Sequence, residues 1–372
     1  MSYQIFMKRT IFCTLRDDKG ATGGPGGVLC LQKKILGESI NGIPCDYWFN
    51  TLRQSTKAPF FSQIIFLCNI LLFSIRVILN KNSYFFTHDI VSGAILASLG
   101  RQYSIIYHQQ GPIIQEKINF GDKISKTKIY VLKKLERKAF VCAHKVYFPS
   151  NGACKMYFKN EYRSCSLKEI HVAKPLYNTF LWDSKFEEVT LLKQDASFIT
   201  LFSAGTLTKA KGQDLTVAFI EKYVELSKKN IRYVLVGQGP LKKELVESLE
   251  SIKQKHSNFS FFYFEQLSHN AVMYLHKISD IYIMLHRISI FDFATLEAMS
   301  QRNAIILSRV GGNTDFQKCE NILFSDELEK NMQVLIDADL EELKEKNFDV
   351  FCRFFSQQSF YEQYKEIFHQ IQ

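Results

Sequence analysis

Glycine and proline are scarce in this sequence, with 18 and 7 among 372 residues, so the chain offers no long flexible linker and is not collagen-like. Its nine cysteines are odd in number and no two are spaced C-x-x-C, which argues against a structural zinc site and against a small disulfide scaffold. We expect them to be free thiols in a reducing compartment. Residues 1–9 lead into a strand-like pattern and not into a long apolar core, so we expect no secretory signal.

The residues that are present are typical of a large globular protein. Hydrophobic residues make up 46% and charged residues 23%, which excludes a disordered chain, and the length suits two domains or one large one. The 32 phenylalanines and 17 tyrosines predict an aromatic core or binding face. Nucleic acid is not the expected partner, because the sequence has neither RNP-type aromatics nor zinc-finger spacing.

The positive charge is concentrated in the first half of the chain. Residues 1–182 carry 25 Lys and Arg against 10 Asp and Glu, a net charge of +15, whereas residues 183–372 have a net charge of −5. This asymmetry predicts two domains with different partners. The densest run, residues 123–138, holds seven basic residues and one glutamate, with apolar residues at roughly helical spacing. It is either a basic amphipathic helix on anionic lipid or the solvated face of a surface helix.

One apolar segment, residues 60–79, is barely long enough to cross a bilayer. It contains Gln63, Asn69 and Arg76, so we interpret it as a buried or membrane-grazing helix and not as a spanning one. Together with the basic run, it predicts a cytoplasmic protein that lies peripherally on the inner face of an anionic membrane.

The second half alternates apolar strands with amphipathic helices. The pattern predicts strands at 198–203, 232–236, 259–264, 281–285 and 304–308, and helices at 213–229, 241–255, 270–278 and 293–301. Strands separated by helices in this way form βαβ units of a parallel, doubly wound sheet.

The first half follows the same scheme less clearly, with strand-like segments at 10–15, 84–87, 104–107 and 145–148 and a helix at 28–36. We therefore predict an α/β protein of two Rossmann-like domains with parallel sheets, at residues 1–178 and 179–355. Residues 356–372 have the composition of a helix, which we expect to pack back on the first domain.

Glycine-rich turns follow several of the predicted strands. Residues 20–28, GATGGPGGV, open a helix, where backbone N–H groups and the helix N-terminus would favour a phosphate. Residues 205–212, GTLTKAKG, place Lys211 just before a helix, where its ammonium would neutralise a diphosphate. Residues 236–240 and 310–313 are further glycine turns at strand ends. Each pattern alone is equally compatible with an ordinary turn or a solvated lysine.

A predicted helix carries Glu297 among the apolar residues Phe293, Ala294, Leu296 and Met299. A carboxylate there would accept hydrogen bonds from ribose hydroxyls, or it would be a solvated or capping glutamate. Because these loops and this helix all follow strands, they should gather at the sheet edge where α/β domains bind ligands.

The order and spacing of these motifs resemble the retaining GT-B glycosyltransferases of family 4. The resemblance rests on Gly205, Lys211-Gly212, Val-Gly-Gln-Gly-Pro at 236–240, Leu-Glu-Ala-Met at 296–299, Gly311-Gly312 and Asp280, and in the first half on Gly23-Gly24, His88-Asp89, His108 and Ser150. It implies a GT-B fold, in which two Rossmann-like domains face each other across a cleft. The second would bind a nucleotide-sugar donor and the first an acceptor, with no cofactor and no obligatory metal.

The resemblance also implies a role for each matched residue. Lys211 would stabilise the diphosphate leaving group, Glu297 would hold the ribose, and His108 would be the active-site histidine near the donor sugar. His88 would lie on the acceptor side, although either histidine is alternatively a core or loop residue. The donor would contact a set of loop residues: Gly23, Gly24, Gly205, Thr206, Gly237, Gly239, Leu267, Ser289, Ile290, Phe291, Asp292 and Phe293.

Three positions depart from the family pattern. Thr206 stands where the family has an arginine, Ser289 where it has the first glutamate of an E-x7-E block, and Glu265 where it commonly has a glycine. The first two changes remove charged groups from the donor site. Asn313 and Arg309 are the candidates to replace the missing cation.

We therefore predict a retaining hexosyl- or N-acetylhexosaminyltransferase. It would pass a sugar from a nucleotide-sugar to a glycan or lipid-linked acceptor in the synthesis of surface polysaccharide, lipopolysaccharide or capsule. The alternative, which Thr206 and Ser289 favour, is a catalytically impaired GT-B protein acting as the partner subunit of another transferase. A sugar-nucleotide epimerase of the same fold is a further alternative.

Overall fold

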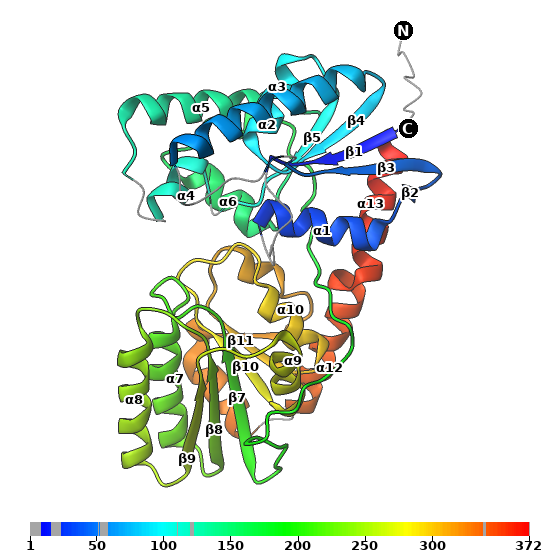
Figure 1. The fold of residues 1–372 in the computed structure, drawn as a ribbon. Coiled ribbons are helices and arrows are strands. Elements are labelled where there is room, and N and C mark those ends of the chain that lie inside the picture. The colour runs from blue at the N-terminus through cyan, green and yellow to red at the C-terminus, as the bar shows by residue number, and fades with distance from the viewer. Residues whose placement is uncertain are drawn as a thin grey trace. The chain divides into compact units, whose positions relative to one another are not determined.

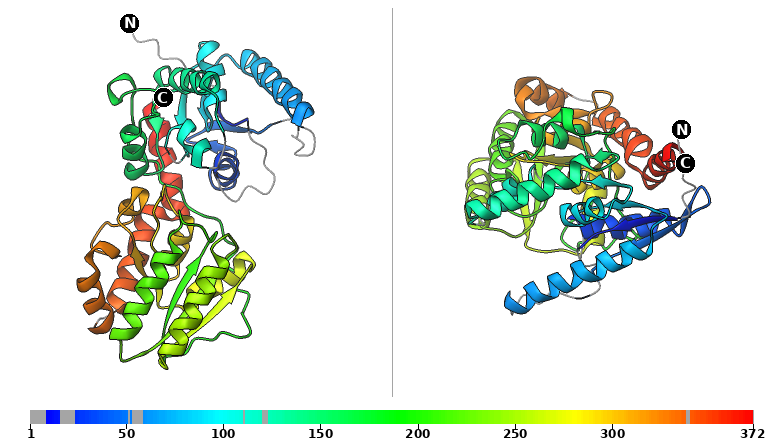
Figure 2. Two further views of the ribbon diagram at one scale, coloured as in Figure 1. Left: turned by 90° about the vertical axis from the view of Figure 1, so that its left-hand side faces the viewer. Right: turned by 90° about the horizontal axis from the view of Figure 1, so that it is seen from above.

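The computed structural model describes residues 9–15, 24–50, 52, 59–109, 111–119, 123–337 and 340–371. The chain divides into two compact units, the first made of residues 1–178 and 357–372 and the second of residues 179–356. Each unit has its own six-stranded sheet with helices on both faces (Figure 1, Figure 2). All nine cysteines lie in the described ranges, and none of them forms a disulfide.

The sheet of the first unit is parallel except at one edge, where β2 pairs antiparallel with β3. Its interior is aromatic, since Phe86 stacks on Phe12 with ring centroids 5.1 Å apart and on Phe368 at 6.1 Å. In spatial order the strands are β2 (Ser39–Ile40), β3 (Ile43–Trp48), β1 (Arg9–Cys13), β4 (Ser83–Thr87), β5 (Tyr103–Ile106) and β6 (Val146–Tyr147).

The helices of the first unit form layers on the two faces of this sheet (Figure 1). One layer is built around α3, which contacts both α2 and α5, and α5 in turn contacts α4. On the other face α1 contacts α13, the C-terminal helix, whose Tyr364 hydroxyl accepts a hydrogen bond from Gln32. The helices are α1 (Gly24–Leu36), α2 (Pro59–Leu79), α3 (Ile90–Ser98), α4 (Ile113–Asn119), α5 (Lys126–Val141), α6 (Asn151–Lys159) and α13 (Gln357–Ile371).

A buried carboxylate joins four parts of the first unit. Glu136 of α5 is fully buried and accepts hydrogen bonds from the Ile113 amide at 2.9 Å, from the hydroxyls of Tyr107 and Tyr157, and from Ser164. Burial raises the pKa of this carboxyl group, although all four donors act in the opposite direction. These contacts fix the segment between β5 and α4, which follows the sheet at its carboxyl edge.

The predicted segment 60–79 forms α2, and it is not a core helix. One face, with Asn69, Phe73 and Val77, is buried against the first unit, and Asn69 bonds the backbone of Leu52. Within the described ranges this is the one helix long and apolar enough to cross a membrane, and 17% of its apolar window is buried. The buried alternative is therefore wrong for most of this helix.

The sheet of the second unit is parallel throughout, as the alternating pattern predicts. Its strands, in spatial order, are β12 (Ile322–Phe324), β11 (Ala304–Leu307), β10 (Ile281–Met284), β7 (Phe198–Ala204), β8 (Asn230–Val236) and β9 (Phe259–Phe264). From β7 the chain builds the sheet in one direction through β9 and then returns to place β10 on the other side. The crevice between the carboxyl ends of β7 and β10 is thus the topological switch point, where open α/β sheets bind ligands.

Two helical layers cover this second sheet (Figure 1). Helix α7 contacts α8 and α11, and on the opposite face α10 contacts α9 and α12. A π-helical turn, Phe351–Phe355, closes the unit. The helices are α7 (Gln213–Leu226), α8 (Lys242–Lys255), α9 (His269–Ile278), α10 (Phe293–Ser300), α11 (Leu328–Asp337) and α12 (Leu340–Val350), with 3₁₀ turns at Gly311–Asp315 and Ser325–Glu327. A further 3₁₀ turn, Leu167–Glu169, belongs to the first unit.

Candidate functional site

The glycine turns at the carboxyl edge of the second sheet serve backbone packing. The loop after β8 hydrogen-bonds the loop after β7, with the Leu207 amide 2.8 Å from the Gln238 carbonyl. Gly237 has a φ of 152°, and a Cβ there would lie 1.9 Å from the carbonyl oxygen of Gly205. Gly212 has a φ of 70°, and its Cβ would lie 1.8 Å from the carbonyl oxygen of Leu285. These positions require glycine whether or not a ligand is bound.

Lys211 lies at the switch point, as its place after β7 predicts. Its Nζ is 2.8 Å from Oδ1 of Asp292 and 3.4 Å from Nε2 of His286, the second residue after the end of β10. The Lys211 side chain is 34% exposed, whereas those of Asp292 and His286 are 8% and 1% exposed. The Lys211 ammonium therefore contacts buried groups of the protein, while part of the side chain remains exposed.

Asp292 is fixed in place as the N-cap of α10. Its Oδ2 accepts hydrogen bonds from the amide and hydroxyl of Thr295, both at 3.2 Å, and from the Tyr282 hydroxyl at 3.3 Å. Burial favours the neutral acid, but the charges and hydrogen bonds of Lys211 and His286 hold the pKa of Asp292 well below its usual range. The carboxylate is consequently ionised beside the lysine.

Glu297, the predicted ribose ligand, lies on α10 and is bound by a histidine. Nε2 of His269 is 2.8 Å from Oε1 of Glu297, and this hydrogen bond raises the pKa of His269. His276 lies on the other side, with Nε2 3.9 Å from Oε2 of Glu297, and burial lowers its pKa to about 3. His276 donates through Nδ1 to Asn303, so its facing nitrogen carries no proton and forms no ion pair.

The segment before α10 divides into residues that face the core and residues that do not. Phe291, a predicted donor contact, is buried and packs on Phe316 with ring centroids 4.7 Å apart. Ser289 is 5% exposed, and its hydroxyl has no hydrogen-bond partner among the described residues. Ile290 and Phe293 are half-buried. The hydroxyl of Ser289 is thus a buried polar group of this segment without a hydrogen-bond partner among the described residues.

The other predicted donor residues lie on the same sheet edge with varied exposure. Thr206, in the loop after β7, is exposed, and Leu267, before α9, is half-buried. Gly205 and Gly239 flank the paired loops described above. In the first unit, Gly24 begins α1, and Gly23 lies outside the described residues.

The candidates to replace the missing cation are engaged elsewhere. Arg309 pairs with Asp326 at 3.0 Å and stacks over Phe324, and Asn313 is buried and donates to the Ser308 carbonyl at 2.9 Å. Neither supplies a cation to Lys211's neighbourhood through these contacts. Glu265 pairs with Lys242 on the surface at 3.1 Å.

In the first unit the two predicted histidines form a pair. Nδ1 of His88 lies 3.1 Å from Nε2 of His108, at the carboxyl ends of β4 and β5. Burial, and then the neighbouring ring, hold the pKa of His88 well below its usual value, and burial lowers the pKa of His108 to about 4. Both rings are therefore neutral near pH 7, and one donates its N–H to the other. His88 is buried, whereas His108 is half-buried and is the ring with access to a ligand.

Sequence reasoning missed two histidines. His286 contacts Asp292, the partner of Lys211, and His269 contacts Glu297. His286 had a usable signal, because it directly follows a predicted strand, as the other candidate residues do. His269 had none, since it opens a helix and reaches Glu297 across 28 positions of sequence.

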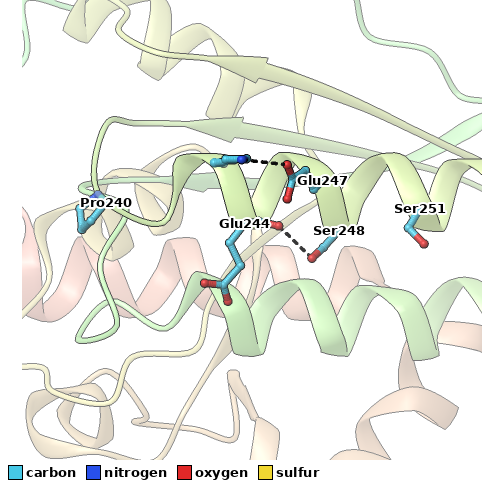
Figure 3. A pocket seen from close by; sticks show the side chains of 6 residues that line it. Pro240, Glu244, Glu247, Ser248 and Ser251 are labelled. Carbon is cyan, nitrogen blue, oxygen red and sulfur yellow. Dashed lines mark hydrogen bonds and ion pairs between the residues drawn. The ribbon is translucent and has the colours of Figure 1, made fainter.

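A shallow pocket elsewhere in the second unit is unrelated to these residues (Figure 3). Its polar side chains have partners in the protein: Ser248 donates to the Glu244 carbonyl at 2.9 Å, Lys243 lies 3.8 Å from Glu247, and Glu244 pairs with Lys209 at 3.1 Å. The lining residues are Pro240, Lys243, Glu244, Glu247, Ser248 and Ser251, none of which was predicted to bind the donor.

The two-unit architecture is that of GT-B glycosyltransferases, so the predicted fold class is confirmed. The chain is similar to sucrose-phosphate synthase from Thermosynechococcus elongatus, with a TM-score of 0.66 and 14% identity over 98% of this chain and 99% of that one. Anabaena HepE in complex with UDP aligns with a TM-score of 0.64 and 14% identity over 97% and 100% of the two chains. The lipopolysaccharide outer core galactosyltransferase WaaB aligns with a TM-score of 0.64 and 11% identity over 97% and 99%.

The sequence comparison concerns the second unit. Residues 186–347 match the family model described as glycosyl transferases group 1, so this unit carries the sequence pattern of that family. The match contains Lys211, Asp292 and Glu297. A comparison with curated protein sequences finds no match.

Proposed function

We propose that this protein is a retaining glycosyltransferase that binds a UDP-sugar in its second unit and passes the sugar to an acceptor held by the first. The observation that carries the proposal is the partly exposed Lys211 side chain at the switch point of β7 and β10. It lies within the segment that matches glycosyl transferases group 1. HepE, which shares the fold, is described in complex with UDP, which supports uracil as the base of the donor nucleotide.

The chemistry follows from the charge that develops when the bond between sugar and diphosphate breaks. Lys211 would stabilise the departing UDP, and the unpartnered hydroxyl of Ser289 would bond a donor oxygen. Glu297 would accept hydrogen bonds from the ribose, and its hydrogen bond with His269 would weaken as a result. His108, oriented by His88, would meet the sugar from the first unit. Retention of the anomeric configuration and transfer of a hexose or N-acetylhexosamine rest on the family resemblance.

We expect catalysis without an obligatory metal, as the family resemblance implies. Transfer should continue in excess EDTA at an unchanged rate. A loss of activity in EDTA that added Mg²⁺ or Mn²⁺ restores would contradict this part of the proposal.

Transfer itself is the direct test. The purified protein should release UDP from a UDP-hexose in the presence of a lipid-linked or lipopolysaccharide acceptor, with the product's configuration read by NMR. Lys211→Ala should lower the rate by roughly 10²–10³, as the loss of one transition-state donor does. Absence of transfer and hydrolysis with every UDP-sugar tested would instead favour the partner-subunit alternative.

The acceptor is proposed to be a surface glycan or its lipid-linked precursor at a membrane. WaaB, named as a lipopolysaccharide galactosyltransferase, shares the fold and supports this assignment. The stronger support is helix α2, whose outward face is apolar. Its exposed large side chains are Phe61, Ile64, Leu67, Leu71, Leu72, Ile75, Ile78 and Leu79.

Such a face favours burial in the interfacial zone of a bilayer. Helix α2 shares a layer with α5, on which Lys126, Lys128, Lys134 and Lys138 are exposed. Lysines beside an apolar helix complement the negative charge of anionic lipid. We propose that α2 lies along the cytoplasmic surface of the membrane and does not span it, because its opposite face, with Phe73, packs against the first unit.

Vesicle co-sedimentation tests this surface. The protein should bind vesicles containing phosphatidylglycerol and bind neutral phosphatidylcholine vesicles more weakly. Replacing Phe61, Leu67 and Leu71 by serine should abolish binding, whereas Leu226→Ser, an exposed leucine of the second unit, should not. Unchanged binding of the triple variant, or resistance of the membrane-bound protein to carbonate extraction, would contradict the proposal.

A further inference from the structure

The ammonium of Lys211, which we propose binds the diphosphate, already forms an ion pair with a carboxylate. Nζ of Lys211 is 2.8 Å from Asp292, whose other oxygen is anchored by Thr295 and Tyr282. Because three donors hold that oxygen and the residue caps α10, the carboxylate stays in place when an anion arrives. Any phosphate that binds the exposed side of Lys211 therefore lies in the field of a fixed negative charge.

This field acts differently on the substrate and on the product of the proposed reaction. In a nucleotide-sugar each phosphate has one ester and one anhydride linkage, and each carries one negative charge. In the released nucleoside diphosphate the terminal phosphate is linked only through the anhydride oxygen, and it ionises a second time near pH 6. At pH 8 the product consequently carries about one more negative charge than the donor, on the phosphate nearest Lys211.

We propose that Asp292 is a specificity-determining residue that disfavours the nucleoside diphosphate product relative to the nucleotide-sugar donor. The proposal rests on the function proposed above. The carboxylate lowers the affinity for both ligands, but it lowers that for the doubly ionised terminal phosphate more. The consequence is faster release of product and weaker product inhibition than Lys211 alone would give.

The test compares two ligands that differ only in that charge, UDP and its β-methyl ester. Their dissociation constants are measured by calorimetry at pH 8 for the unmodified protein and for Asp292→Asn. Asparagine is isosteric and caps a helix as well as aspartate, so α10 should be retained. The Asn variant should bind the methyl ester about threefold more tightly and UDP about tenfold more tightly. The terminal phosphate of UDP carries twice the charge of the esterified one, so its repulsion by Asp292 is twice as large in free energy.

Two controls separate this effect from other causes. Glu250→Gln removes an exposed carboxylate of α8 and should change neither constant. If Asp292→Asn lowers the melting temperature by more than a few degrees, Asp292→Ser provides a second variant with a capping side chain.

The outcomes are distinguishable. An equal change for both ligands, or weaker binding of both, would mean that Asp292 only orients Lys211, and it would overturn this inference while leaving the transferase proposal intact. Failure of UDP to bind the unmodified protein would overturn the proposed function together with the inference.

Discussion

Nε2 of His269 lies 2.8 Å from Oε1 of Glu297, so the carboxylate proposed to hold ribose is paired with a histidine of the neighbouring helix. The Glu297 side chain is 13% exposed and the His269 side chain 45%. The contact is therefore partly screened by water, and it is accessible to a ligand that would share the carboxylate.

This pair predicts a pH-dependent contribution to stability. The hydrogen bond to Glu297 raises the pKa of His269 above its value in the unfolded chain, about 6.5. The stabilisation is thus fully present below pH 6.5 and is lost as the pH rises through the higher folded-state pKa. His269→Ala should lower the melting temperature by about 1–2 °C at pH 6, from roughly 0.5 kcal/mol, and leave it unchanged at pH 9.

The exposed histidine of α13, His369, is the matched control, and His369→Ala should show no such difference between the two pH values. A loss of equal size at pH 6 and pH 9 for His269→Ala would indicate lost packing and not a charged pair.

The close approach at Gly212 predicts a specific sensitivity to a single methyl group. Alanine there would combine a φ of 70° with a Cβ 1.8 Å from the Leu285 carbonyl oxygen, so Gly212→Ala should cost more than about 2 kcal/mol. Gly100→Ala is the matched control, because Gly100 has a φ of 61° with nothing within 4 Å of the added Cβ. It should cost only about 1 kcal/mol.

Chemical denaturation of both glycine variants provides the comparison. Equal losses would show that backbone conformation alone decides the cost and that the loop after β7 moves away from β10 freely.

The buried carboxylate of the first unit, Glu136, predicts a large effect on stability. Glu136→Ala removes the acceptor of the Ile113 amide and the Tyr157 hydroxyl, while the Tyr107 hydroxyl keeps the Gly111 carbonyl at 3.0 Å, and it should lower the unfolding free energy by about 3 kcal/mol. Glu136→Gln retains an acceptor oxygen and should cost less. Glu161→Ala, at an exposed carboxylate nearby in sequence, should be neutral within about 0.5 kcal/mol.

These variants are compared by thermal and urea unfolding. A loss below about 1 kcal/mol for Glu136→Ala would mean that the four donors find other partners or water.

The architecture of the second unit was predictable because its strands and helices have clear and different periods. Helix α13 begins and ends at the residues where the composition predicts it, within the range 356–372. Strand β3 was missed, since its sequence IPCDYW contains a proline and an aspartate, which are rare in strands, although β3 lies between β2 and β1 in the sheet. The sequence left open whether α2 is buried or grazes a membrane, because an apolar sequence cannot distinguish a core from a membrane surface.

The candidate site was predictable only in part. The position of Lys211 after β7 follows from the order of local motifs, but its contact with Asp292 joins residues 81 positions apart. That contact exists because β10 pairs with β7, and strand order is not encoded in any local pattern. The glycine at 237 was interpreted as a ligand contact, although the close approach to Gly205 already explains it.

The most direct test of the central claim is the binding of a UDP-sugar to the ammonium of Lys211, measured by calorimetry with UDP-glucose, UDP-galactose and UDP-N-acetylglucosamine. Lys209 is the matched control, since it lies two residues away and pairs on the surface with Asp214 and Glu244. The account predicts binding of at least one of these donors, a loss of about 10²-fold or more in affinity in Lys211→Ala, and no loss in Lys209→Ala. Equal affinity of the Lys211→Ala variant, or no binding of any donor to the unmodified protein, would contradict it.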